Sequence, residues 1–174
     1  TVMAEQTRTL VAFGDSITEG ETGMPDPEKR WVTILERELP AAFPDTDWRV
    51  INAGVGGQSD REKMQRLQRD VLAHDPDILL LQFGGNNVGF LDPSRRVEPE
   101  ETEAFLEELR SAIPGKTSPF VITFPVLIDE QHKVMKQPGA EEYFRPHGGL
   151  DACVEVYRRK TRAFAERYGY PLID

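Results

Sequence analysis

Several features are scarce in this 174-residue sequence, and each scarcity excludes a class of protein. Cys153 is the only cysteine, which excludes an intrachain disulfide and a zinc site built from several cysteines. Apolar runs such as residues 78–81 are far too short to span a bilayer. Because 21 basic residues stand against 30 acidic ones, the net charge of −9 repels phosphate backbones and anionic lipids. We therefore expect no nucleic-acid partner and no membrane association.

The remaining composition is typical of one globular domain. Hydrophobic residues make up 39% of the chain and charged residues 29%, both close to globular averages. A chain of this length buries about two-thirds of its unfolded surface, so residues 1–174 are predicted to form a single domain. No signal peptide is visible, which favours a cytoplasmic location. The acidic residues near Glu100 look like a solvated helix start, and we expect neither a metal nor an organic cofactor.

Short apolar runs closed by turn signals predict five strands, and side chains at helical spacing predict the helices between them. The predicted strands are residues 8–13, 48–52, 77–83, 120–124 and 170–174. The predicted helices are residues 28–39, 59–74, 99–113 and 150–168. Pro40 is expected to end the first helix, whereas Ser59 and Glu62 form a capping box at the start of the second. Residues 125–149 show little periodicity and predict a long loop with short helical turns.

Alternating strands and helices predict a doubly wound parallel sheet in a three-layer α/β/α fold. With strand order 2-1-3-4-5, a crevice opens between the first and third strands at their carboxyl ends. No helix follows the last predicted strand, so part of one sheet face would lie in water. We therefore expect the parent protein to continue beyond Asp174 with a C-terminal segment.

The carboxyl ends of the first three predicted strands carry the candidate site. Ser16 follows the first strand, a glycine-rich loop at residues 52–57 follows the second, and residues 84–87 follow the third. The asparagines of the chain all lie in the last two segments, at Asn52, Asn86 and Asn87. Asp15 and Ser16 could instead cap the next helix, and glycine and asparagine are also ordinary turn residues.

A serine at a shared strand edge suits nucleophilic attack on an ester carbonyl. The attack creates an oxyanion, and each N–H donor aimed at that oxygen contributes roughly 3–4 kcal/mol to catalysis. Glycines let backbone N–H groups approach closely, and the Asn86 side chain can supply another donor. We therefore take Ser16 as the candidate nucleophile.

Three segments resemble the sequence blocks of the GDSL (SGNH) hydrolases, a family of serine esterases and lipases. Gly14-Asp15-Ser16-Ile17-Thr18 resembles block I, and Asn52-Ala53-Gly54-Val55-Gly56-Gly57 resembles block II. Gly84-Gly85-Asn86-Asn87 resembles block III, with Asn87 where the family usually has aspartate. The resemblance implies a flavodoxin-like fold without cofactor, Ser16 as nucleophile, and an oxyanion hole formed by the N–H groups of Ser16 and Gly57 and the Asn86 side chain.

The general base and its acidic partner cannot be carried over from that family. They come from an Asp-x-x-His block after the fifth strand, and the sequence stops at Asp174. His74 is expected at the opposite edge of the sheet from Ser16. His147 with Asp151 is a possible alternative pair, although a solvated loop histidine is the more ordinary interpretation, as it is for His132.

The sequence therefore predicts a serine hydrolase that cleaves acyl esters through an acyl-enzyme intermediate. The small-molecule substrate could be a short acyl ester, a lysophospholipid, a thioester or an acetylated carbohydrate, and residues 125–149 are expected to shape that choice. A non-catalytic ester-binding or glycan-binding module on the same fold is the alternative, with a phosphate binder as a third option. The oligomeric state is left open.

Overall fold

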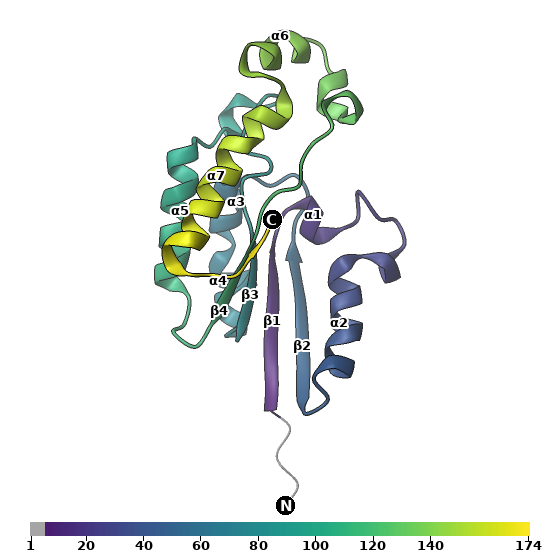
Figure 1. The fold of residues 1–174 in the computed structure, drawn as a ribbon, viewed down its shortest axis with the longest axis vertical. Helices are drawn as coiled ribbons and strands as arrows, with labels where there is room; N and C mark the ends of the chain where they lie inside the picture. Colours follow the sequence, from purple (N-terminus) through teal and green to yellow (C-terminus); the bar gives the residue numbers. More distant parts are fainter. Residues whose placement is uncertain (1–5) are drawn as a thin grey trace, which may run out of the picture.

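A computed structural model describes residues 6–174, in which a parallel sheet forms the centre of the molecule (Figure 1). The strand order is β2-β1-β3-β4-β5, as predicted. The strands are β1 (Gln6–Gly14), β2 (Thr46–Gly54), β3 (Ile78–Gln82), β4 (Ser118–Ile122) and β5 (Leu172–Ile173). Because all of these pairings are parallel, the segments that follow the strands leave from one edge of the sheet.

Helices flank the sheet on both faces. The α-helices are α1 (Ser16–Glu19), α2 (Trp31–Ala42), α3 (Asp60–Gln65), α4 (Leu67–Asp70), α5 (Pro99–Ala112), α6 (Ala140–Phe144) and α7 (Leu150–Tyr168). Short 3-10 turns are η1 (Pro27–Lys29), η2 (Leu72–His74), η3 (Pro93–Arg95), η4 (Asp129–Gln131), η5 (Lys133–Lys136) and η6 (Arg145–His147). None of the helices in this part of the chain is both long and apolar enough to cross a membrane.

Alternate side chains of β1 enter two separate cores, as the period of two in a strand requires. Val11 and Phe13 pack with α4, α5 and α7 on one face of the sheet. Leu10 and Ala12 pack with α2 on the other face. The three layers of the predicted α/β/α fold are therefore present.

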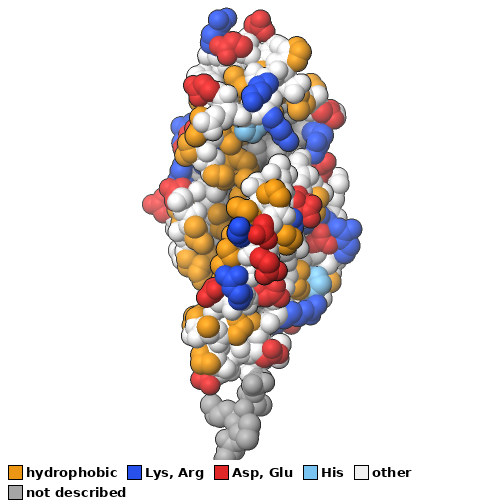
Figure 2. Space-filling view, turned by 90° about the vertical axis from the view of Figure 1, so that its right-hand side faces the viewer, with side chains coloured by type: hydrophobic (Ala, Val, Ile, Leu, Met, Phe, Trp, Pro, Cys, Tyr) orange, Lys and Arg blue, Asp and Glu red, His pale blue; other side chains and the backbone are white. Residues whose placement is uncertain are grey.

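The α2 face of the sheet is less fully covered than the other face. Ile78, Phe120 and Ile122 are half-buried there, and Ile173, in register with Ile122, is 52% exposed. Hydrophobic side chains accordingly gather along one side of the view in Figure 2, beside a charged surface. The expected exposure of part of one face is thus observed within residues 6–174.

The long segment between β4 and α7 folds into short helices, as predicted. It stands beyond the carboxyl edge of the sheet (Figure 1) and packs on a core that it shares with the first turns of α7. Asp129 caps the start of α7, because its carboxylate accepts hydrogen bonds from the N–H groups of Leu150 and Asp151 at 2.8 and 2.9 Å. The core of this segment contains Phe124, Ala140, Phe144, Leu150 and Val154.

Two expectations about the first helices are wrong. Helix α2 continues through Pro40 to Ala42, because a proline in the last turn removes only one hydrogen bond and Phe43 N–H still reaches Leu39 O. The single helix expected over 59–74 is instead α3, α4 and η2, separated at Arg66 and Val71.

The strands differ in extent from the prediction: β1 and β2 are longer at both ends, and β3 is one residue shorter at each end. Strand β4 begins and ends two residues earlier than expected and includes Pro119. The missing proline N–H is tolerated because β5 pairs only with Val121 and Ile122, which leaves β4 with an open edge at Pro119. Strand β5 is limited to Leu172 and Ile173.

Candidate active site

Ser16 lies at the start of α1, directly beyond the carboxyl end of β1. The neighbouring Asp15 is the residue that caps this helix, since its Oδ1 accepts a hydrogen bond from Ile17 N–H at 3.1 Å. Ser16 is half-buried, and within residues 6–174 no hydrogen bond engages its hydroxyl group. The capping alternative therefore applies to Asp15, and the Ser16 hydroxyl is left available for chemistry.

Three side chains from different elements hold α1 in place. Trp31 Nε1 of α2 donates to Ile17 O at 2.8 Å. Asn52 Nδ2 of β2 donates to Thr18 O at 3.0 Å. The Thr18 hydroxyl in turn donates to Gln82 Oε1 of β3 at 2.9 Å. Asn52 is thus a support for the Ser16 turn, and not a group directed at substrate.

Gly57 lies in the loop after β2 with a left-handed φ of 74°, which a glycine adopts without strain. The loop is anchored because Arg95 Nη2 donates to Gly57 O at 2.6 Å and to Glu62 Oε2 at the same distance. Gly57 itself is exposed, and its N–H has no hydrogen-bond partner in the part of the chain that the structure describes. This N–H is consequently free to bind an external acceptor.

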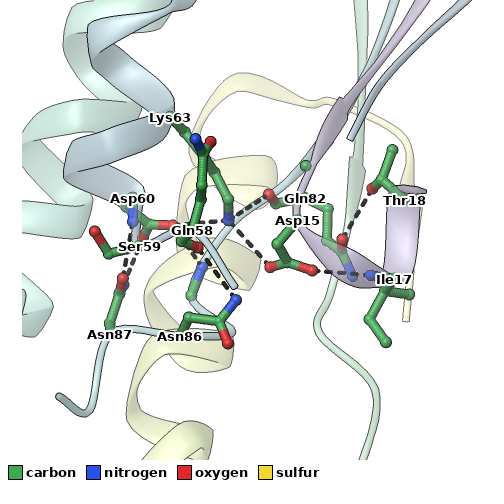
Figure 3. Close-up of polar contacts among 12 residues, drawn as sticks. Asp15, Ile17, Thr18, Gln58, Ser59, Asp60, Lys63, Gln82, Asn86 and Asn87 are labelled. Carbon is green, nitrogen blue, oxygen red and sulfur yellow. Dashed lines mark hydrogen bonds and ion pairs between the residues drawn. The ribbon is translucent and has the colours of Figure 1, made fainter. Parts of the chain in front are cut away.

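Asn86 connects the loop after β3 with the loop after β2. Its Nδ2 donates to Gln58 O at 3.2 Å (Figure 3), which orients the amide group and leaves its second N–H without a protein acceptor among the described residues. Gln58 is held from its other side, because its Oε1 accepts from Arg66 Nε at 2.5 Å. The half-buried Asn86 is therefore a fixed donor at the carboxyl edge of the sheet.

Close contacts confirm that the three predicted segments meet. A Cβ atom added to Gly85 would lie 2.7 Å from Asp15 Oδ2, so the loop after β3 touches the Ser16 turn. A Cβ added to Gly54 would lie 2.1 Å from Glu19 N, so the end of β2 touches the same turn. The predicted convergence of the three strand ends is thus observed.

The close approach at Gly54 gives a testable contrast with Gly57. We expect Gly54→Ala to lower the free energy of unfolding by about 3 kcal/mol, because the new methyl group would overlap the backbone of α1. Gly57→Ala should cost only about 1 kcal/mol, the strain of a left-handed alanine, since nothing lies within 4 Å of its added Cβ. Urea unfolding of both variants measures the difference, and equal losses would contradict this explanation.

Asn87 has a structural position behind the site. Its side chain is fully buried, its Oδ1 accepts from Asp60 N–H at 2.9 Å, and its Nδ2 donates to Asp60 Oδ2 at 2.6 Å (Figure 3). The same Nδ2 donates to the Thr102 hydroxyl at 2.9 Å, and this hydroxyl donates to Asp60 Oδ2. The Asn87 amide thus supplies both the donor that the Asp60 carboxylate needs and the acceptor that the Asp60 N–H needs.

We therefore expect Asn87→Asp to destabilise this chain by about 3 kcal/mol at pH 7, because two buried carboxylates would face each other without a proton. The pKa of the new carboxyl group would be raised on folding, so the penalty is present above that raised pKa and disappears as the pH falls toward the unfolded value. Urea unfolding should show that the free energy of unfolding of the variant differs less from that of the wild type at pH 5 than at pH 7. A gap that is equal at both pH values would contradict the pairing.

Two basic residues of the site were missed by sequence reasoning. Lys63 is fully buried, and Arg66 is 5% exposed with its guanidinium donating to Gly14 O and Ala53 O, each at 2.7 Å. Arg66 thereby joins the ends of β1 and β2 at the break between α3 and α4. The sequence carries no signal for either role, because a basic residue in an amphipathic helix usually lies in solvent.

None of the three histidines hydrogen-bonds Ser16 in residues 6–174. The His74 ring lies 3.4 Å from Arg49, before β3 at the opposite edge, as expected. His132 Nδ1 accepts from Val134 N–H, and burial lowers the pKa of this histidine.

The alternative pair of His147 and Asp151 is not formed. The Asp151 carboxylate pairs with Arg158 and accepts from Leu127 N–H at 2.7 Å, since it lies at the start of α7. The exposed His147 instead faces Tyr143, with ring centroids 6.3 Å apart. His147 and Asp151 therefore do not form the base and acid pair that the sequence allowed.

The fold and site together define an α/β/α protein with a serine turn after β1, between a glycine loop and an asparagine loop. A profile of the GDSL-like lipase/acylhydrolase family matches residues 12–174, and the chain belongs to this family. The family is one of ester hydrolases, so the chain's relatives support ester hydrolysis in general terms.

Individual relatives agree with this assignment. An uncharacterized lipoprotein, YqeF, of Bacillus subtilis strain 168 is 30% identical over 95% of this chain and 69% of its own length. An acetylxylan esterase of Geobacillus stearothermophilus is 31% identical over 45% of this chain and 39% of its own length. The crystal structure of LAE5, an alpha/beta hydrolase enzyme from the metagenome of Lake Arreo in Spain, superposes with a TM-score of 0.69 and 28% identity, covering 98% of this chain and 78% of that one.

Proposed function

We propose that this protein is a serine hydrolase that cleaves small acyl esters, with Ser16 as the nucleophile. The observation that carries the proposal is the convergence of an available hydroxyl group with two free donors at one sheet edge. Ser16, Gly57 and Asn86 come from three different strand ends, and their neighbours hold each one in place. The segments that carry these groups contact the Ser16 turn, which is the arrangement that an oxyanion hole next to a nucleophile requires.

The proposed reaction proceeds through an acyl-enzyme. The Ser16 oxygen attacks the ester carbonyl carbon, and the carbonyl oxygen becomes an oxyanion that accepts hydrogen bonds from Ser16 N–H, Gly57 N–H and Asn86 Nδ2. The serine proton passes to a general base and then to the departing alcohol oxygen as the ester C–O bond breaks. Water attacks the acyl-enzyme by the same route and releases the acid.

We propose that the general base is not one of the described histidines and is supplied by a part of the protein outside residues 6–174. Strand β5 runs parallel to β4, so Asp174 is at the same edge of the sheet as Ser16, where its carboxylate accepts from the Thr123 hydroxyl at 2.8 Å. Chain continuing from this point would start at the same edge as Ser16, with β3 and β4 between them, whereas the three described histidines contact other residues. A histidine there would complete the serine–base arrangement that nucleophilic hydrolysis requires.

The experiment is an ester series assayed on the full-length protein and on residues 1–174. The series holds p-nitrophenyl acetate, butyrate and decanoate with an acetylated xylooligosaccharide, which is included because one relative is named an acetylxylan esterase. We expect the full-length protein to hydrolyse short acyl esters and the 174-residue chain to be much slower. Binding of these esters without hydrolysis by the full-length protein would favour the non-catalytic module instead.

The cytoplasmic location expected from the sequence stays a prediction. One relative is described as a lipoprotein, so cell fractionation of the full-length protein is the relevant measurement.

A further inference from the structure

We propose that Lys63 is a positioning residue, which holds the Ser16 turn and the Asn86 loop in one fixed arrangement from behind the site. This inference rests on the proposed function, because it concerns the geometry that Ser16 and Asn86 need to act on the same carbonyl group. It assigns a role to a buried charge that the reaction itself does not use.

The Lys63 ammonium group has three acceptors, one for each of its protons. Its Nζ donates to Asp15 Oδ2 at 3.2 Å, to Asp60 Oδ1 at 3.1 Å and to Gln82 O at 3.1 Å (Figure 3). The side chains of Lys63, Asp15 and Asp60 are all fully buried. The three acceptors come from the end of β1, the start of α3 and the end of β3, so one atom joins three elements of the site.

Through Asp15, Lys63 fixes the turn that carries Ser16. Asp15 binds Lys63 through Oδ2 and caps α1 through Oδ1, which accepts from Ile17 N–H. Ser16 lies between Asp15, which binds the Lys63 ammonium, and Ile17, whose N–H donates to the Asp15 carboxylate. A shift of the Asp15 carboxylate would therefore move the serine backbone directly.

Through Asp60, Lys63 also fixes the loop at residues 84–87, which contains Asn86. Asp60 Oδ1 accepts from Lys63 and from Gly84 N–H at 2.9 Å, and its Oδ2 accepts from Asn87 and Thr102. Gly84 and Asn87 are the residues that bracket the loop containing Asn86. Because the Asp60 carboxylate is bonded at both oxygens, it transmits the position of Lys63 to both ends of this loop.

The charges explain why a lysine can occupy this place. Burial lowers the pKa of Lys63, but the carboxylates of Asp15 and Asp60 outweigh that effect and raise its pKa above the ordinary value. The Phe83 ring, whose centroid is 5.1 Å from Nζ, covers the ammonium further. Lys63 is therefore charged at neutral pH, and without it two buried carboxylates would be left without a cation.

Catalysis needs this kind of rigidity more than folding does. A displacement of about 1 Å between a nucleophile and an oxyanion donor can lower a rate by about 10²-fold, although the fold is retained. A buried ion pair, in contrast, is often no more stabilising than an apolar side chain of the same volume. The arrangement around Lys63 is thus better explained by precision at the site than by stability alone.

The test compares Lys63→Met with Leu109→Ala in the full-length protein, with p-nitrophenyl acetate as substrate. Methionine is unbranched like lysine, is one atom shorter, and carries no charge. Leu109 is fully buried in the last turn of α5, in the core that contains Val11 and Phe13. Its replacement by alanine is the control, because it should lower stability without moving Ser16 or Asn86. Thermal unfolding gives the stability of each variant, and steady-state kinetics separate kcat from KM.

We expect Lys63→Met to lower kcat by about 10²-fold with KM changed less than about threefold, while Leu109→Ala keeps kcat within about twofold of the wild type at a comparable loss of stability. Labelling of Ser16 by a fluorophosphonate should slow in parallel with kcat. Unchanged kcat in Lys63→Met, or equal losses in the two variants, would overturn the inference.

A milder variant decides the question if Lys63→Met does not fold. Thr102→Val removes one hydroxyl from Asp60 at the far end of the network, and it should lower kcat by about tenfold with little change in KM. Unchanged kcat in a folded Thr102→Val would overturn the inference. A wild type that hydrolyses no ester would overturn the proposed function and this inference together, whereas an active wild type with an unimpaired Lys63→Met overturns the inference alone.

Discussion

Ser16→Ala is expected to lower the kcat/KM of the full-length protein for p-nitrophenyl acetate by at least about 10⁴-fold, because no acyl-enzyme can form without the hydroxyl group. Stability should change by less than about 0.5 kcal/mol, since no hydrogen bond within residues 6–174 depends on this hydroxyl. Initial rates of p-nitrophenol release measure the first effect, and urea unfolding measures the second.

The matched control is Ser118→Ala, at the amino end of β4 and on the opposite edge of the sheet. Ser118 is exposed, so this variant should keep both activity and stability. A Ser16→Ala variant that hydrolyses the ester at a rate close to that of the wild type would show that another group is the nucleophile.

Asn86→Ala has the second largest expected effect, a fall in kcat of about 10²- to 10³-fold with little change in KM. The amide N–H left free by the hydrogen bond to Gln58 is the donor that would be lost. Because it acts on charge that develops in the transition state, its removal should affect kcat more than substrate binding. The measurement is steady-state kinetics over a tenfold or wider range of substrate around KM.

Asn86→Asp provides a control for shape. The carboxylate has the size of the amide but cannot donate, and it would repel both the oxyanion and Gln58 O, so kcat should fall at least as far as in Asn86→Ala. A kcat within about twofold of the wild type in Asn86→Ala would remove this residue from the oxyanion hole.

The fold was largely predictable because the signals for its elements are local. The nearly continuous apolar run of β3 identifies a central strand, and alternation of strands and helices identifies a doubly wound parallel sheet, whose expected order 2-1-3-4-5 is observed. The capping box of Ser59 and Glu62 forms as expected, with Ser59 N–H donating to Glu62 at 2.7 Å. The same topology puts the segments that carry Ser16, Gly57 and Asn86 at one edge of the sheet.

The inner support of the site was not predictable, because it depends on contacts between distant residues. Lys63 and Arg66 have the spacing of a solvated helix face, yet both turn inward to acceptors at the ends of β1, β2 and β3. No glycine or proline lies at the break between α3 and α4 at Arg66, so the sequence does not predict it. The role of Asn87 likewise became visible only with its partner Asp60, 27 residues earlier in the chain.

A crystal structure of the full-length protein treated with a p-nitrophenyl alkylphosphonate would test the central claim most directly. We expect a bond between Ser16 Oγ and phosphorus, with one phosphonyl oxygen about 2.7–3.1 Å from both Gly57 N and Asn86 Nδ2. Phosphorus bound to another residue, or a phosphonyl oxygen directed away from both donors, would contradict it.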